Sequence, residues 1–456
     1  MGQISPFNIV IDGAPDKNGV FRIYEMQPAD HSGSKGQLAV FGEDLLLERT
    51  FPFLENKFGT LWRKDGLDDD PLLSASIARQ LDRTNNLPNV RWASFQGILL
   101  PLGIRRNSEV ADLRNRYPNL TMPAQTGLIC NAFFWKTVFA AILPQSLKPH
   151  MPDHEIMPRM TLSPLRKALI ERFGADRDII IKGATDVMGQ SVGLINRAML
   201  NDDTPHRNEL SGINLSKLYN FLGHRRVDNH RVLRHLLSNG LLQKNADETV
   251  LVAQECIDPM LLRANDGLDY RATMRVHCTV WWDENGHGQV EYQGAYWKLP
   301  PESAQDQSTD MSVMSPRQKG RAYDKQFASV DPVLESEIFM QLETPLISAM
   351  EDFHAMNENP EPVILDLLRH SNRGHRLTGL WLASRWQDIA WGNETIFPDA
   401  LSTAILNAAR CDPVVGYVCR MISKDKHSHH GFEAAVTKKL DGNHIDSFQN
   451  AYHLTV

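Results

Sequence analysis

The chain has 456 residues, of which 42% are hydrophobic and 23% are charged, and its formal net charge is −7. This composition is typical of a globular protein with two or three domains, and the acidic balance argues against a broad nucleic-acid surface. The five cysteines form no CxxC pair, which is typical of reduced thiols. We find no signal peptide or bilayer-spanning segment and expect a cytoplasmic protein that binds neither membranes nor nucleic acids.

The chain is expected to open with a β-hairpin. Two β-prone segments, 9–11 and 20–24, flank a polar turn. Such a hairpin places Asp12 and Glu25 on adjacent antiparallel strands, and Gln27 lies on the same face as Glu25 because it is two residues farther on. Carboxylate and amide oxygens suit Mg²⁺, so these three residues are candidate metal ligands. The alternative is an exposed hairpin with scattered acids.

The middle of the chain offers a candidate phosphate site. A helix is expected over 163–174, which carries Lys167, and a β-branched strand over 179–182, which ends in Lys182. A lysine before a glycine-containing loop can lie beside phosphates while backbone N–H groups hold them. In this loop the candidates are Gly189, Gln190 and Ser191. The loop is no Walker A sequence, and a solvated lysine before an ordinary turn is the alternative.

Two further β regions carry candidate ligand-binding residues. A strand is expected over 249–257, where Gln254 and Glu255 could read the edge of an adenine ring. A second hairpin is expected over 270–299 because a polar turn joins two β-prone flanks. Its first strand carries Arg275, which could clamp a transferring phosphoryl group. The alternatives are a surface glutamate on an edge strand and an arginine paired with surface acids.

The remaining segments are expected to be mainly helical. Residues 215–242 look helical and basic, residues 300–325 look like a linker or mobile loop, and a helical pattern runs from about residue 330 to the end. A rival metal site would use Asp366 and Asn372, although their spacing does not place them next to each other on one strand face. A histidine-rich segment over 424–430 is more typical of a loop than of a metal site.

Taken together, the order of these elements resembles the ATP-grasp ligase superfamily. The matching elements are, in chain order, Lys167, Lys182, the loop over 189–193, Gln254 with Glu255, and Arg275. In that family the metal ligands, an Asp and a later Glu-x-Asn, follow these elements. Here Asp12, Glu25 and Gln27 precede them, an order similar to the circularly permuted members such as glutathionylspermidine synthase. Gln27 stands where the family usually has Asn.

The resemblance implies a fold, a chemistry and a set of roles. The fold would be α+β and ATP-grasp-like, with two α/β subdomains around a nucleotide cleft and a mainly helical C-terminal region. The reaction would be ATP-dependent and Mg²⁺-dependent amide formation between a carboxylate and an amine, each a small molecule or a peptide. Lys167, Lys182 and the loop would hold phosphates, Gln254 and Glu255 adenine, and Arg275 the acyl phosphate.

Three other functions stay open. The same scaffold could carry a kinase, in which a hydroxyl group replaces the carboxylate as acceptor. A protein that binds nucleotide without turnover is another, since Gln27 departs from the family pattern and Asp186 adds a negative charge to the phosphate loop. An α-helical scaffold protein would bind no nucleotide at all.

The expected division of the chain follows from these assignments. The hairpin of the ATP-grasp core occupies residues 1–50, an accessory α/β region 51–160, and the nucleotide-binding subdomains 161–300. A linker covers 301–329 and a mainly helical region 330–456. The sequence does not identify the substrates or the oligomeric state.

Overall fold

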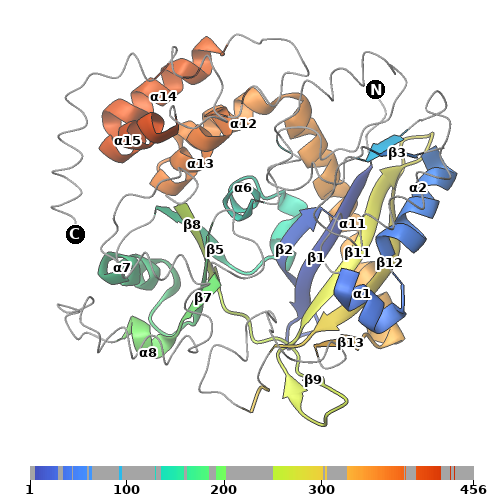
Figure 1. Cartoon of the computed structure of the whole chain (residues 1–456). Coiled ribbons are helices and arrows are strands. Elements are labelled where there is room, and N and C mark those ends of the chain that lie inside the picture. The colour runs from blue at the N-terminus through green and yellow to red at the C-terminus, as the bar shows by residue number, and fades with distance from the viewer. Residues whose placement is uncertain are drawn as a thin grey trace.

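The computed structural model describes part of the chain in detail. The described residues are 6–28, 34–43, 45–58, 61–63, 92–94, 129, 135–158, 162–183, 192–201, 250–300, 303–305, 326–384, 386, 397–422, 432 and 436. They form two main antiparallel sheets and two short two-stranded sheets, with helices around them (Figure 1). The expected mixture of helices and sheets is therefore confirmed.

The larger sheet joins the first expected hairpin to the second one. Its strands are β1 (Phe7–Pro15), β2 (Phe21–Pro28), β11 (Thr273–Trp282), β12 (Gly288–Lys298) and β13 (Phe327–Ser329). Their order is β13-β12-β11-β1-β2, and every neighbouring pair is antiparallel. Both expected hairpins are present, and β1 pairs with β11 across more than 260 residues of sequence.

The first hairpin is closed by its own turn residues. The Asp16 carboxylate accepts hydrogen bonds from the backbone N–H groups of Asn18 and Val20, at 2.8 and 3.1 Å, and from Arg22 Nε at 2.8 Å. Gly19 has a φ of 79°, a conformation that costs glycine little. Local side-chain bonds of this kind compete well with extended structure, so the chain reverses here.

The smaller sheet lies beside the edge strand β2 of the larger one. Its strands are β5 (His154–Pro158), β6 (Ile179–Gly183), β7 (Val192–Ile195) and β8 (Val250–Glu255), in the order β5-β8-β6-β7. Helices α7 (Leu162–Phe173) and α8 (Arg197–Leu200) accompany it. Leu165 and Leu169 of α7 pack with Ile179 and Ile181 of β6 in a separate small core.

The main hydrophobic core lies between the larger sheet and the helices that follow it. These helices are α11 (Pro332–Glu358), α12 (Pro360–Arg369), α13 (Arg373–Ser384), α14 (Asp399–Cys411) and α15 (Pro413–Ile422). Apolar residues of the sheet such as Ile9, Ile11 and Val276 share this core with Leu342 and Phe353 of α11. Alternating side chains of a strand face opposite sides, so the polar residues between these apolar ones lie on the other face of the sheet.

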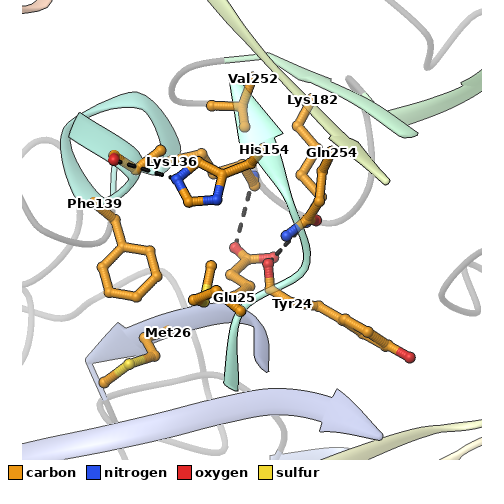
Figure 2. A pocket seen from close by; sticks show the side chains of 11 residues that line it. Tyr24, Glu25, Met26, Lys136, Phe139, His154, Lys182, Val252 and Gln254 are labelled. Carbon is orange, nitrogen blue, oxygen red and sulfur yellow. Dashed lines mark hydrogen bonds and ion pairs between the residues drawn. The ribbon is translucent and has the colours of Figure 1, made fainter. Parts of the chain in front are cut away.

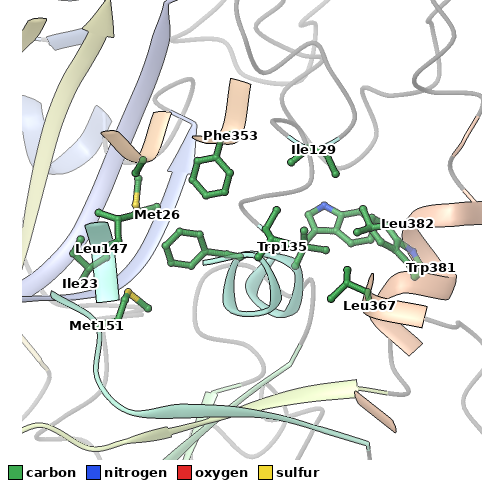
Figure 3. Packing of buried hydrophobic residues seen from close by; sticks show 14 of the residues in the cluster. Ile23, Met26, Ile129, Trp135, Leu147, Met151, Phe353, Leu367, Trp381 and Leu382 are labelled. Atoms are coloured by element: carbon green, nitrogen blue, oxygen red, sulfur yellow. The ribbon is translucent and has the colours of Figure 1, made fainter. Parts of the chain in front are cut away.

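Helix α6 (Lys136–Ala141) stands between the two sheets and extends the core. A 3₁₀ helix, η6 (Gln145–His150), follows it. Figure 3 shows Met26 and Leu147 on one side of α6 and Trp381 on the other, with Trp135 at its start. This packing fixes where the first residue of α6, Lys136, lies relative to β2.

A second group of helices covers part of the larger sheet from its polar side. It comprises α1 (Ser34–Phe41), the π-helix η1 (Leu46–Thr50) and α2 (Phe51–Phe58) (Figure 1). A side chain at Gly36 would bring its Cβ within 2.4 Å of the Tyr296 ring, so glycine permits the close approach of α1 to β12. Short strands β3 (Leu61–Arg63), β4 (Trp92–Ser94), β9 (Leu262–Arg263) and β10 (Asp269–Tyr270) complete the elements.

Several expected elements fall outside the described residues. These are the basic segment 215–242, most of the linker over 300–325 and the histidine-rich segment 424–430. In the part of the chain that is described, no helix combines the length and apolar character needed to cross a membrane.

Candidate functional site

The polar face of the larger sheet carries a row of buried charged residues. Asp12 of β1 lies directly opposite Glu25 of β2 on one side and Arg275 of β11 on the other. Arg275 is in turn opposite Tyr296 of β12, and Lys298 follows two residues later on the same face. The strand register alone therefore places these side chains together.

Asp12 is held between two cations. Its Oδ1 accepts a hydrogen bond of 2.7 Å from Arg275 Nε, and its Oδ2 accepts bonds of 2.6 Å from both Arg275 Nη2 and Lys298 Nζ. All three side chains are buried. Burial alone would raise the pKa of Asp12, but the adjacent guanidinium and ammonium groups hold it well below its usual range. Asp12 is therefore a carboxylate at every physiological pH.

Glu25 extends this row toward the smaller sheet. Its carboxylate lies 3.6 Å from Lys136 Nζ at the start of α6. Its charge also acts on Lys182, Arg275 and Lys298. Gln27 is half-buried two residues beyond Glu25, on the same face of β2. The three predicted metal ligands thus share one face of one sheet.

Lys182 reaches this region from the smaller sheet. Its Nζ donates hydrogen bonds to the backbone oxygen of Tyr24 at 2.7 Å and to Gln254 Oε1 at 2.5 Å. The side chain is buried, and burial, with the charge of Lys136 adding to it, lowers the pKa of Lys182 to about 8. An ammonium group held at this cost in a polar pocket is typical of a functional site.

The two sheets enclose a small pocket at this junction (Figure 2). Its polar lining comes from Glu25, Lys136, His154, Lys182 and Gln254, and its apolar lining includes Met26, Phe139, Met151 and Val252. The space that water can occupy in it is about 20 Å³, which is enough for roughly one water molecule. The pocket in this closed arrangement therefore has a mixed lining but no room for a nucleotide.

A second polar group lies under α1, next to the buried ions. His277 follows Arg275 on the same face of β11, stacks on Tyr296, and lies 3.2 Å from Gln37 Nε2 of α1. Burial, with Arg275 adding to it, lowers the pKa of His277 to about 3, so the ring is neutral. Burial raises the pKa of Tyr296 to about 12. These uncharged side chains lie next to the row of buried charged residues.

Some predicted residues lie elsewhere. Lys167 is exposed on α7 and is not among the residues that line the pocket. Glu255 alternates with Gln254 along β8 and forms an ion pair with Arg177, so only Gln254 of the two lines the pocket. Gly189, Gln190 and Ser191 fall outside the described residues.

The rival metal site is not assembled. Asp366 is exposed on α12, whereas Asn372 lies after that helix and donates to Glu155 Oε1 at 2.5 Å. The two side chains therefore serve different parts of the surface, as the helical pattern of 362–368 indicates.

Several residues of the site were not predicted, among them Lys136, His154, His277 and Lys298. The alternation Arg275-Val-His277-Cys-Thr279 is a period-2 pattern that does predict a shared face for its polar members. Lys298 shares this face because it lies two residues beyond Tyr296, which is opposite Arg275. Lys136 lies in a segment that is apolar enough to suggest a buried helix, so no local signal marks it as a site residue.

Magnesium can be tested against this geometry. Carboxylate and amide oxygens have the right chemistry, but both oxygens of Asp12 already accept bonds from Arg275 and Lys298. No group of three His, Cys, Asp or Glu side chains among the described residues is placed to hold a metal ion. The residues present do not fit a free divalent cation.

Comparisons with known proteins add little. No protein-family model matches the chain, and no curated protein matches it. A proposed gamma-glutamylcysteine synthetase from Methylobacillus flagellatus is 9% identical, with a TM-score of 0.32 over 79% of this chain and 91% of its own. A glutathione synthetase-like effector from Globodera pallida is 12% identical, with a TM-score of 0.26 over 65% and 73%. Both TM-scores are too low to carry an argument about fold or function.

Proposed function

We propose that the chain is an ATP-dependent ligase that joins a carboxylate to an amine. One observation carries the proposal. Lys182 and Gln254 of the smaller sheet meet Glu25 of the larger sheet in one pocket, beside the buried row of Asp12 and Arg275. Cations from two sheets around one junction suit the transfer of a phosphoryl group, which depends mainly on positioning and charge stabilisation.

The proposed reaction has two steps. An oxygen of the substrate carboxylate forms a bond to the γ-phosphorus of ATP, the bond from that phosphorus to the β–γ bridging oxygen breaks, and ADP leaves. The amine nitrogen then bonds to the carbonyl carbon of the acyl phosphate. The carbon–oxygen bond to phosphate breaks, inorganic phosphate leaves with the electron pair, and the nitrogen loses a proton to solvent.

The side chains divide between the two ends of the nucleotide. Lys182, with Lys136 beside it, would contact the phosphates, and the end of β8 around Gln254 would face the base. Arg275 and Lys298 would stabilise the negative charge of the acyl phosphate, because charged donors held in a buried site act strongly on developing charge. Lys167 has no role in this scheme because it is exposed.

ATP can enter only if the sheets separate. Pockets for ligands of this size usually measure at least about 300 Å³, far more than the 20 Å³ open to water here. Entry would draw Lys182 away from the Tyr24 carbonyl, to which it now donates, and give it phosphate oxygens instead. The closed pocket is therefore the ligand-free arrangement in this proposal.

Trapping of the intermediate tests the proposal without knowledge of the amine. Hydroxylamine converts an acyl phosphate into a stable hydroxamate. We expect hydroxamate and ADP when the protein is incubated with Mg·ATP, hydroxylamine and pools of amino acids, dicarboxylates and peptides. Lys182→Met should abolish both products and Lys148→Met, an exposed lysine of η6, should abolish neither. Phosphorylation of a hydroxyl compound without hydroxamate would identify a kinase instead.

A protein that binds nucleotide without turnover is the second candidate. The observation in its favour is that both oxygens of Asp12 accept bonds from Arg275 and Lys298. An acid neutralised in this way would not contribute to a metal site. ATP binding without ADP release in any substrate pool would support this candidate over the ligase.

A further inference from the structure

Among the described residues, six ionic side chains extend from the polar face of the larger sheet to the pocket beside the smaller sheet, and their charges do not balance. This ionic cluster consists of Asp12, Glu25, Lys136, Lys182, Arg275 and Lys298. Its members act on one another: Glu25 and Asp12 are the carboxylates that influence Lys182, Arg275 and Lys298. With four cations and two carboxylates, the cluster has two formal positive charges in excess.

The excess lies in a region that is largely closed to water. Asp12, Lys182, Arg275 and Lys298 are all less than 10% exposed, and the side chain of Lys136 is 11% exposed. Charges in such surroundings are weakly screened, so two uncompensated positive charges destabilise the folded protein much more than they would at the surface. A bound anion would remove this imbalance, whereas a bound divalent cation would double it.

The hydrogen bonds inside the cluster also favour an anion over a cation as its ligand. Asp12 already has a bidentate partner in Arg275 and a second partner in Lys298, and Glu25 lies beside Lys136. Both oxygens of Asp12 are thus occupied, and Glu25 shares the pocket with the ammonium group of Lys136. Lys182, in contrast, donates to a neutral backbone oxygen and a neutral amide oxygen, both of which a phosphate oxygen would outcompete.

We propose that the ionic cluster binds a polyphosphate anion without a metal ion, and that a divalent cation enters only with or after the anion. This inference rests on the proposed function in that the anion would be the triphosphate chain of the nucleotide. It differs from the proposed function because it concerns recognition alone and makes no use of turnover.

Calorimetric titration with and without metal tests this order. The protein is titrated with inorganic tripolyphosphate and with ATP, each in excess EDTA, then with MgCl₂ alone and with Mg·ATP. We expect both anions to bind in EDTA and MgCl₂ alone to produce no binding heat. Lys298→Met should weaken tripolyphosphate binding in EDTA by about 10-fold or more, since a buried charged hydrogen bond is lost, while Lys148→Met should leave the affinity unchanged.

The outcomes separate the inference from the proposed function. If Mg·ATP binds but neither anion binds in EDTA, or if MgCl₂ binds alone, the metal-free site is disproved while a ligase remains possible. If both anions bind in EDTA but no hydroxamate forms with any pool, the site stands and the ligase fails. Should Lys298→Met not fold, Lys136→Met tests the same charge from α6 and should also weaken binding in EDTA. An unchanged affinity in the folded variants would overturn the inference.

Discussion

The ammonium group of Lys182 donates a hydrogen bond of 2.7 Å to the backbone oxygen of Tyr24, a residue 158 positions earlier in the chain. This bond joins the smaller sheet to the edge strand of the larger one. It buries a cation in a pocket whose acidic lining residue, Glu25, lies beside another lysine. Burial of this cation lowers the stability of the folded protein, and a bound anion would offset that loss. The first prediction follows from this relationship.

Lys182 should make the stability of the protein rise in alkaline solution. Burial lowers its pKa from 10.5 to about 8, so between these values the unfolded chain binds a proton that the folded protein does not. Stability then increases with pH across this window, by about 3 kcal/mol if the full shift is expressed. Below about pH 8 both states carry the charge, and above 10.5 neither does.

Denaturant unfolding of the wild type and Lys182→Met between pH 7 and 10.5 measures this contribution. The difference in unfolding free energy between the two proteins should grow in favour of the wild type as the pH rises. Lys148→Met, which alters an exposed lysine, should follow the wild type. A constant difference between wild type and Lys182→Met would show that Lys182 is not buried as a cation.

Removal of the Asp12 charge should destabilise the protein strongly. Asp12→Asn keeps the size of the side chain but leaves Arg275 and Lys298 buried without their shared carboxylate. The loss of one member of a buried ionic group typically costs about 3–5 kcal/mol. Urea unfolding at pH 7 provides the measurement.

Asp258→Asn is the matched control for this change. The Asp258 side chain is 74% exposed and lies 3.9 Å from Arg271, so its loss should cost less than about 1 kcal/mol. Equal effects of the two substitutions would contradict the buried ionic row on the larger sheet.

His277 should make the protein sensitive to mild acid. Burial, with Arg275 adding to it, lowers its pKa from 6.5 to about 3, so below pH 6.5 the unfolded chain gains a proton that the folded protein excludes. Stability therefore falls as the pH falls through this window, by about 2 kcal/mol at pH 5. His277→Gln should lose less stability than the wild type between pH 7.5 and 5, as measured by urea unfolding.

The control for His277 is a histidine on the surface of the same hairpin. The side chain of His287 is 73% exposed, and His287→Gln should retain the full acid sensitivity of the wild type. If His277→Gln and the wild type lose the same stability between pH 7.5 and 5, the ring is protonated in the folded protein and the assigned environment is wrong.

Local signals in the sequence were sufficient for both hairpins of the larger sheet. The polar turn predicts that the chain reverses between the first two strands. The pairing of Asp12 with Glu25 depends in addition on a register shift between Asp12 and Gly13, which the turn does not predict. Strand alternation also predicts that Gln27 shares their face. The pairing of Asp12 with Arg275 could not be predicted, because nothing near either residue specifies a partner 263 positions away.

Lys167 and Lys136 show two different relations between sequence and structure. Lys167 was chosen as a phosphate ligand from its place in the order of elements, yet the amphipathic pattern of its helix already puts it on the side opposite Leu165 and Leu169. Lys136 reaches the pocket because α6 packs between the two sheets. The residues around Lys136 do not predict tertiary packing of this kind.

ATP binding by three proteins tests the central claim most directly. Calorimetric titration of Mg·ATP into the wild type, Lys182→Met and Lys148→Met asks whether the junction of the two sheets is the nucleotide site. We predict that the wild type and Lys148→Met bind with equal affinity and that Lys182→Met binds at least about 10-fold more weakly, since it loses a charged donor to phosphate. Equal binding by all three proteins, or no binding by the wild type, would contradict the account.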